Sequence, residues 1–309
     1  TIRGEHIRPE ERNQHPFHFR HFTSSDNGRT WSDQGSVMSP AQNKQSFYHR
    51  NIWSSSIKPI SKTQKLVSFT GIRQQDPQHQ FLQAIGVAVT KDGQNISALQ
   101  EQALSCPQRD YESITKAGYY LGPKEQLGAN KGEDDGPILA WRDPFIFVDD
   151  NDEIQLFWSA KIAAREAAIA HATLQQNDTG FAIKTLHPPM LLPDGHNITQ
   201  AEIPKIHHDK KTGKYYLLVS ACDRLYENQP EQQVSKTLRL YTAQSIRGPW
   251  QSYKEQGSTL PGLAHCFGAS ILSADFDKPE LYLICPRTEM APPALQLTFA
   301  PVQTVCISQ

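Results

Sequence analysis

Three charged residues, Arg142, Asp143 and Glu202, have the types and positions that glycoside chemistry requires. Arg142 and Asp143 stand side by side before one apolar run, and Glu202 stands before a later one. Two carboxylates that face one cavity can cleave a glycosidic bond, one as general acid and the other by stabilising an oxocarbenium-like transition state. The adjacent guanidinium would keep the Asp143 carboxylate ionised. The alternative is that both acidic residues only cap strand ends.

The elements that would position these residues are predicted to be β-strands. Short β-branched and aromatic runs alternate with turn residues along the chain. The alanine-rich segment 160–172 is interpreted as a strand, a turn and a second strand, although alanine favours helices. The expected fold class is therefore all-β.

Four segments of the chain repeat one plan: a polar opening, a short apolar strand, a polar turn and a second, more hydrophobic strand. They begin at Trp53, Arg142, Ala201 and His265. The last three begin roughly 60 residues apart, and repeats of several strands at such a period suggest propeller blades. The longer first interval contains residues 91–140, which we interpret as an inserted loop region. Because the innermost strand of a blade lines the central channel, the polar openings would share one cavity.

The stretch before Trp53 is interpreted as the outer part of one more blade. Its sequence "SSDNGRTW" at 24–31 matches the Asp-box pattern, in which an Asp and a Gly shape a hairpin turn and the Trp packs beneath it. Asp26 is therefore expected to be structural. The predicted architecture is a single catalytic domain over residues 1–309, a five-bladed β-propeller whose first blade lacks its inner strand in this chain.

Composition excludes several classes of protein. The formal net charge is −1 and the mean hydropathy is −0.56, so neither nucleic acid nor an anionic membrane is an expected partner. The five cysteines have no paired metal-ligand spacing, and the odd number leaves at least one thiol free. His15, His18 and His21 would alternate faces on a strand. We therefore expect no metal site, and the proposed chemistry needs no cofactor.

Several motifs, in order, resemble the fructosyl-transferring propeller enzymes of glycoside hydrolase family 68, which includes levansucrase, inulosucrase and bacterial β-fructofuranosidase. The resemblance covers most of residues 15–309. It rests on six stretches: "IWSSS" at 52–56, "WRDPFIFVDD" at 141–150, "TQAEIPKI" at 199–206, "YYLLVSACDR" at 215–224, "LRLYTAQSIRGPW" at 238–250 and "FAPVQTVCI" at 299–307.

The resemblance implies a role for each matching residue. Asp143 would stabilise the transition state, Arg142 would orient it and hold a sugar hydroxyl, and Glu202 would be the general acid/base. The other implied contacts are Trp53 as an apolar wall, Ser54 beside the nucleophile, Gln200 and Arg224 on the leaving sugar, and Tyr241 near Glu202. Trp53 and Tyr241 are also compatible with core aromatics, and Arg224 with a surface cation.

This chain departs from the family at two positions beside the glutamate. Ile203 stands where the family commonly has arginine, which puts details of the acceptor side in doubt. Thr199 falls near an aspartate that helps bind calcium in Gram-positive members, so the resemblance does not imply a structural calcium.

The family's nucleophile, an aspartate after a tryptophan on the inner strand of the first blade, has no counterpart, because the chain contains no Trp-Asp pair. A retaining reaction cannot start without it. The chain could be truncated, or it could be a sugar-binding pseudoenzyme. The favoured explanation is a companion peptide from before Thr1 that supplies strand and aspartate, giving a heterodimer.

The function expected from these features is cleavage of sucrose with retention, passing fructose to water or to another sugar. An extracellular or periplasmic location is expected with it. One alternative is a related propeller glycosidase acting on arabinose- or galactose-type sugars. Another is a non-catalytic sugar-binding propeller.

Overall fold

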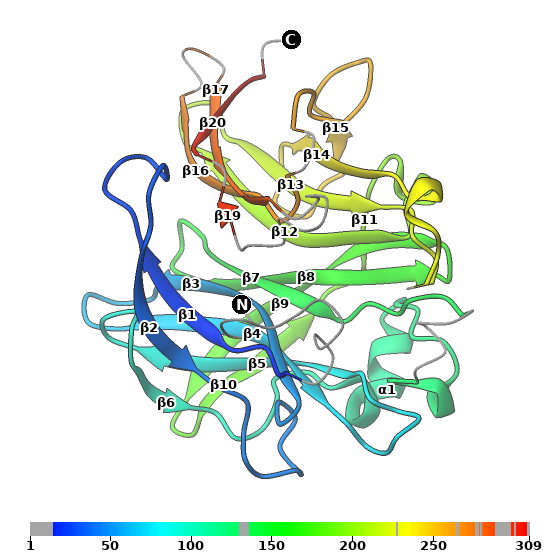
Figure 1. Cartoon of the computed structure of the whole chain (residues 1–309). Coiled ribbons are helices and arrows are strands. Elements are labelled where there is room, and N and C mark those ends of the chain that lie inside the picture. The colour runs from blue at the N-terminus through cyan, green and yellow to red at the C-terminus, as the bar shows by residue number, and fades with distance from the viewer. Residues whose placement is uncertain are drawn as a thin grey trace.

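The computed structural model describes residues 15–129, 136–226, 228–263, 266–275, 278, 280–287, 298–299 and 301–307. Strands dominate these residues (Figure 1). They contain one α-helix, α1 (Pro107–Lys116), and three short 3-10 helices, η2 (Lys124–Gln126), η3 (Gly195–Asn197) and η4 (Glu231–Gln233). The all-β expectation is confirmed, and none of the described helices is long and apolar enough to span a membrane.

Four antiparallel sheets follow one another along the chain. Successive strands pair within them, except that β11 pairs with β9 and β20 pairs with β17. The first contains β3 (Asn51–Pro59), β4 (Lys65–Arg73), β5 (Leu82–Thr90) and β6 (Ile96–Leu99). The second contains β7 (Arg142–Val148), β8 (Ile154–Ala163), β9 (Glu166–Asn177), β10 (Gly180–Leu186) and β11 (Met190–Leu191). The third contains β12 (Gln200–Asp209), β13 (Lys214–Cys222), β14 (Lys236–Ala243) and β15 (Gln251–Ser252). The fourth contains β16 (Ser270–Asp275), β17 (Glu280–Ile284) and β20 (Gln303–Cys306).

These sheets are the blades of a β-propeller, and their first two strands coincide with the four repeated segments. His265, the expected start of the last repeat, lies outside the described residues. The expectation of five blades is wrong for this chain, because the described residues form four. The stretch before Trp53, interpreted as part of a fifth blade, forms a two-stranded hairpin of β1 (Phe19–Thr23) and β2 (Ser32–Met38). Another small antiparallel pair consists of β18 (Pro286–Arg287) and β19 (Thr298–Phe299).

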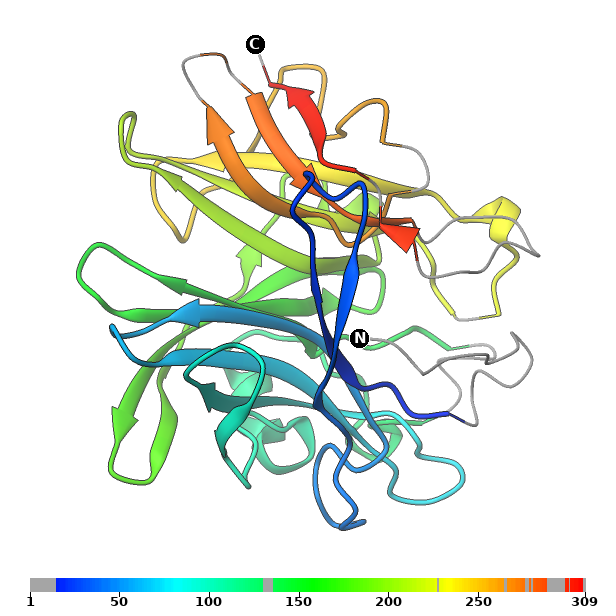
Figure 2. The same cartoon turned by 60° about the vertical axis from the view of Figure 1, so that its left-hand side comes forward.

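The β1–β2 hairpin runs across from the first blade towards the fourth (Figure 2). At its start the backbone N–H of Ile52 donates to the carbonyl of Phe17 (3.4 Å). At its tip the N–H of Val302 donates to the carbonyl of Asn27 (3.0 Å). The hairpin therefore contacts segments at both ends of the described chain.

The Asp-box turn at the tip of this hairpin has the structural role expected for it. The Asp26 carboxylate accepts the backbone N–H groups of Arg29 and Thr30 and the hydroxyl of Thr30, at 3.0, 2.9 and 2.6 Å. The Trp31 indole donates to the carbonyl of Gly28 (3.0 Å). These bonds, led by the Thr30 hydroxyl, lower the pKa of Asp26 to about 2.

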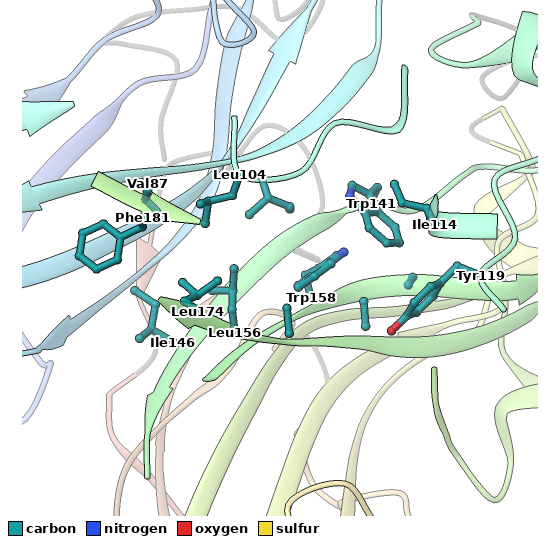
Figure 3. Close-up of a cluster of buried hydrophobic side chains, with 14 of the residues drawn as sticks. Val87, Leu104, Ile114, Tyr119, Trp141, Ile146, Leu156, Trp158, Leu174 and Phe181 are labelled. Carbon is teal, nitrogen blue, oxygen red and sulfur yellow. The ribbon is translucent and has the colours of Figure 1, made fainter. Parts of the chain in front are cut away.

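Apolar clusters between neighbouring blades hold the propeller together. Between the first two blades, Trp141 packs edge-on against Trp158 with ring centroids 5.0 Å apart, and residues of α1 join the same cluster (Figure 3). Comparable clusters join the second blade to the third and the third to the fourth. Around the channel β3 therefore packs on β7, β7 on β12 and β12 on β16.

Two further expectations concern local structure. Segment 160–172 is a strand, a turn and a strand as predicted, because β8 ends at Ala163 and β9 begins at Glu166. Segment 91–140 is not all loop. It contains β6, which completes the first blade, and α1, which packs on the core; residues 130–135 of this segment lie outside the described residues.

Candidate active site

The inner strands of the first three blades share an irregularity at the point where each opens. The pairing register shifts between Trp53 and Ser55 on β3, between Arg142 and Phe145 on β7, and between Glu202 and Lys205 on β12. An extra residue in one strand forms a β-bulge, which bends the strand and re-aims side chains.

The residues inside these bulges have left-handed backbone conformations. The φ angle is 25° at Ser54, 63° at Asp143 and 52° at Ile203. Positive φ is an outlier for a β-branched residue such as Ile203. Strain of this kind persists where surrounding structure enforces it, and it clusters at functional sites.

All three bulges converge on the carboxyl group of Asp143. The Ser54 hydroxyl from β3 and the backbone N–H of Ile203 from β12 both act on this carboxyl as hydrogen-bond donors that lower its pKa. The backbone N–H of Asp143 donates to the Thr70 hydroxyl on β4 (2.8 Å). The strained backbone thus brings three blades together around one acidic side chain.

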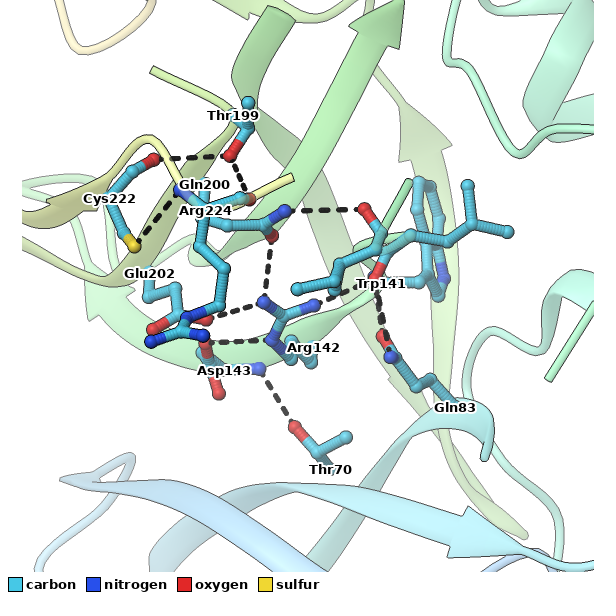
Figure 4. A network of polar contacts seen from close by, with 12 residues as sticks. Thr70, Gln83, Trp141, Arg142, Asp143, Thr199, Gln200, Glu202, Cys222 and Arg224 are labelled. Atoms are coloured by element: carbon cyan, nitrogen blue, oxygen red, sulfur yellow. Dashed lines mark hydrogen bonds and ion pairs between the residues drawn. The ribbon is translucent and has the colours of Figure 1, made fainter. Parts of the chain in front are cut away.

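Arg142 joins the two acidic residues predicted from the sequence (Figure 4). Its Nη2 lies 2.5 Å from Oε1 of Glu202, and its Nε lies 3.7 Å from Oδ2 of Asp143. The same guanidinium donates to the side-chain oxygen of Gln200 and to the carbonyl of Leu139, both at 2.8 Å. The two carboxylates of neighbouring blades therefore share one cation.

Burial separates the roles that the two carboxylates can take. The side chain of Asp143 is 6% exposed and that of Glu202 is 23% exposed. Burial raises the pKa of Asp143, the Arg142 charge opposes this rise, and repulsion from Glu202 adds to it. Glu202 is thus the carboxylate that is more accessible to solvent, and Asp143 is the more deeply buried one.

Gln200 and Trp53 lie beside this centre. The Gln200 amide is 2% exposed and is bonded on both sides, to Arg142 and to the carbonyl of Ile138 (3.2 Å). In this structure it therefore supports Arg142, and contact with a leaving sugar stays a prediction. Trp53 opens β3 opposite Thr70, and its buried indole N–H has no hydrogen-bond partner among the described residues.

Tyr241 does not lie beside Glu202, and the expectation that it tunes this residue is not supported. It is fully buried on β14, the third strand of its blade, within the cluster between the second and third blades. Its hydroxyl donates to Asp194 (2.7 Å), which also binds Arg239 at 2.6 Å. A residue two strands out from the channel is held away from the site by the width of the blade.

Arg224 follows the end of β13, next to the site. Its guanidinium donates to the carbonyl of Gln229 (2.9 Å) and pairs with the carboxylate of Glu231, and its own carbonyl accepts the hydroxyl of Thr199. These contacts fix the loop that follows β13. Contact between Arg224 and a sugar remains a prediction.

Sequence reasoning missed two lysines near the site. Lys161 on β8 is fully buried and donates to the carbonyl of Thr199 (2.7 Å), just before β12; burial lowers its pKa to about 7, and the Arg142 charge adds to the effect. Lys205 on β12 is also buried. The sequence does contain a signal for them, because each lysine stands inside an apolar run, and a lysine is rarely fully buried unless it is paired.

No cluster of three or more His, Cys, Asp or Glu side chains able to hold a metal occurs in the described part of the chain.

Comparison with known proteins identifies the fold. No protein-family profile and no curated protein sequence matches the chain. Among solved structures, Bacillus subtilis levansucrase has 13% sequence identity and a TM-score of 0.64, covering 94% of this chain and 76% of its own. A variant of B. megaterium levansucrase has 13% identity and a TM-score of 0.65, covering 94% and 74%. A xylan β-1,4-xylosidase from B. halodurans has 14% identity and a TM-score of 0.57, covering 92% and 47%.

The chain therefore has the propeller fold that these glycosidases share. The similarity to levansucrases extends over nearly all of it. At these identities the similarity defines the fold alone, so a function rests on the geometry of the site.

Proposed function

We propose that this protein is a retaining glycosidase that cleaves sucrose and transfers fructose. The observation that carries the proposal is the placement of Asp143 and Glu202 on neighbouring inner strands, where both contact the guanidinium of Arg142. Glycoside cleavage uses such paired carboxylates. The resemblance to fructosyl-transferring enzymes supports sucrose as the substrate, and one similar solved structure is a levansucrase complexed with sucrose.

In the proposed reaction a nucleophilic aspartate attacks the anomeric carbon of the fructosyl unit while the bond to the glucose oxygen breaks. Glu202 donates its proton to that oxygen. Arg142 contacts Oε1 of Glu202, so Oε2 is the oxygen suited to carry the proton. Asp143 stabilises the positive charge that develops on the sugar. Glu202 then accepts a proton from water or from a sugar hydroxyl, which attacks the same carbon and releases the nucleophile.

The proposal requires a nucleophile from outside the described residues, because the sequence has no Trp-Asp pair. We assign it to an additional β-strand that lies between the first and fourth blades. Two observations support this place. Ile57 on β3 is 48% exposed and Leu272 on β16 is 53% exposed, and both lie on the inner strands of the outermost blades. Apolar side chains on an inner strand are suited to burial by a neighbouring strand.

Sucrose itself provides the decisive test. We expect the protein that carries the nucleophile strand to release glucose from sucrose, with the fructosyl product keeping its anomeric configuration in an NMR time course. Glu202→Gln should remove this activity. An inverted product would exclude a retaining reaction.

A second candidate is a glycosidase for pentose- or galactose-type sugars, favoured by the similarity of fold to the xylosidase. Aryl arabinofuranoside and aryl xyloside, assayed beside sucrose, distinguish the two. If no substrate turns over but calorimetry detects sugar binding, the protein is a non-catalytic sugar-binding propeller and the proposal is wrong.

A further inference from the structure

A buried lysine, Lys205, lies on the same inner strand as Glu202. Lys205 as a whole is only 8% exposed to solvent. Its ammonium lies over the ring of Phe145 on β7, 5.1 Å from the ring centroid. Burying an ammonium is costly unless charge partners compensate it, so the position of Lys205 calls for an explanation.

The bulge in β12 turns Lys205 towards the site. Glu202 lies opposite Ser220, and Lys205 lies opposite Leu218. Lys205 is three residues after Glu202 on β12, whereas their partners on β13 are two residues apart, so β12 has one extra residue here. In a regular strand, residues three apart point to opposite faces. The extra residue cancels this alternation and puts Glu202 and Lys205 on one face.

The facing strand β7 has the matching arrangement. Arg142 lies opposite Ser159 and Phe145 lies opposite Phe157, which again places residues three apart on one face. The two strands therefore meet through two successive contacts. Arg142 pairs with Glu202 at the opening, and the Lys205 ammonium packs on Phe145 one step further along. Asp143 is the bulge residue between these two contacts.

The two carboxylates of the centre share one cation that contacts both of them. Asp143 and Glu202 carry two negative charges when ionised, and Arg142 supplies one positive charge that both share. The other groups at the Asp143 carboxyl, the Ser54 hydroxyl and the Ile203 N–H, are neutral. A buried ammonium close to Asp143 would offset part of the remaining negative charge.

Two further cations lie near the centre: Arg224 (Figure 4), which follows β13 and also pairs with Glu231, and Lys161 on β8. The Lys161 ammonium binds the carbonyl of Thr199, and its charge acts on Arg142. Lys205 is coupled to Asp143 itself: burial lowers the pKa of Lys205 to about 8, and the charge of Asp143 opposes that fall. Because such coupling is reciprocal, the ammonium must also favour the charged form of Asp143.

We propose that Lys205 is a positioning residue whose ammonium, turned inward by the β12 bulge, favours the ionised form of the Asp143 carboxyl against the burial that opposes it. The proposal deepens the proposed function, on which its meaning for catalysis rests, because the ionised carboxylate is the form that stabilises an oxocarbenium-like transition state. Its physical content, a charge coupling between two side chains, can be measured without turnover.

The direct test is a carboxyl-carbon NMR titration of the chain labelled with [4-13C]aspartate, with Asp143→Asn used to assign the resonance. We expect Lys205→Met to raise the titration midpoint of Asp143 by roughly half a pH unit or more. Lys205→Arg, which keeps the charge, should restore it. Lys184→Met, at an exposed position on β10, is the matched control and should leave it unchanged. An unchanged midpoint in Lys205→Met would overturn the proposal.

The reciprocal titration needs no Lys205 variant and decides the matter if Lys205→Met fails to fold. With [6-13C]lysine labelling, Asp143→Asn should lower the midpoint of Lys205, because the opposing anion is lost. A Lys205 midpoint that does not move would refute the coupling. Both titrations use the unliganded protein, so a shift without sucrose cleavage would uphold the role of Lys205 while the proposed function fell.

Discussion

At the scale of single residues, the chemistry depends on how Arg142 divides its contacts. One guanidinium holds Glu202 at 2.5 Å, Asp143 at 3.7 Å and Gln200 at 2.8 Å. Fixing both carboxylates on one rigid cation limits their separation and orientation, which is what positioning for a glycosidic bond requires. The two acidic side chains differ mainly in burial, and in the proposed reaction the more exposed one, Glu202, transfers the proton.

Glu202→Gln is predicted to lower kcat for sucrose by about 10²- to 10⁴-fold, the usual contribution of a positioned acid–base group. The amide can still accept a hydrogen bond from Arg142, so the folded structure should persist. Steady-state kinetics and circular dichroism together test this. Glu255→Gln, in an exposed turn, serves as the control, and near wild-type activity in Glu202→Gln would remove Glu202 from its role.

Asp143→Asn is predicted to change the pH dependence of stability. Because burial raises the pKa of Asp143, folding favours the protonated carboxyl. Its stabilising contribution is complete below the unfolded pKa of about 4 and is lost as pH rises through the raised folded pKa. The asparagine side chain does not titrate, so the variant does not lose this stabilising contribution as the pH rises.

The variant's Tm relative to wild type should therefore increase as the pH rises above about 4.5, as measured by calorimetry. Asp178→Asn, in the exposed turn between β9 and β10, should show no such trend. A difference in Tm that is flat or falls with pH would contradict a raised pKa at Asp143. Turnover should also be lost, with part of the sucrose binding retained.

At the scale of elements, the repeated bulge is the device that builds the site. Trp53, Arg142 and Glu202 each precede the register shift of an inner strand. β16 also shifts register, between Ile271 and Ser273. All four inner strands thus depart from regular pairing near their starts. One departure contains Asp143, and two others, at Ser54 and Ile203, supply groups that act on its carboxyl.

In the first blade, Phe47 packs directly against Gly71 and Gly86, near the strand that carries Trp53. A Cβ on Gly71 would lie 2.5 Å from Phe47 Cδ2 and 2.9 Å from the Phe47 carbonyl oxygen. Phe47 stacks on Phe69, and the nearby Arg50 guanidinium lies 4.7 Å from the ring centroid of Phe81, which in turn contacts Trp53. Gly71 therefore supports the segment that adjoins Trp53.

Gly71→Ala is predicted to destabilise the protein by about 1–3 kcal/mol through overpacking. Urea denaturation measures the change. In a Phe47→Ala background the same substitution should cost less, because the side-chain part of the clash is gone. Equal costs in both backgrounds would show that Phe47 does not set the packing of this sheet.

At the scale of the whole molecule, the described residues form four blades, with the β1–β2 hairpin crossing from the first to the fourth (Figure 2). The inner strands between other blades bury their apolar side chains, whereas Ile57 and Leu272 are exposed at the two outermost inner strands. An additional strand at this place would cover both and bring a carboxylate to the channel.

Active material is predicted to contain a polypeptide beyond the described residues that supplies this strand and the nucleophilic aspartate. Its carboxyl should lie about 5–5.5 Å from that of Glu202, the separation used by retaining enzymes. Denaturing mass spectrometry would detect it as a separate peptide or as additional chain. If the 309-residue chain alone cleaves sucrose at full rate, the nucleophile lies within it and this assignment is wrong.

Local sequence pattern was sufficient to predict the strand pairs and the meeting of Arg142, Asp143 and Glu202. Alternating apolar residues and polar turns act over a few positions, and strands that open at the same end of successive blades bring their first residues together. For the same reason the Asp-box turn and the strand pair in segment 160–172 could be predicted.

The tertiary structure alone decided which residues face the centre. A bulge exists only relative to the partner strand, so no local pattern revealed that Ser54 and Ile203 would both serve Asp143 or that Lys205 would turn inward. Tyr241 was misplaced for a related reason: its distance from Glu202 is set by how many strands separate them, and its partner Asp194 comes from another part of the chain. The number of blades likewise depends on which sheets pack together around the channel, which is a property of the assembled molecule.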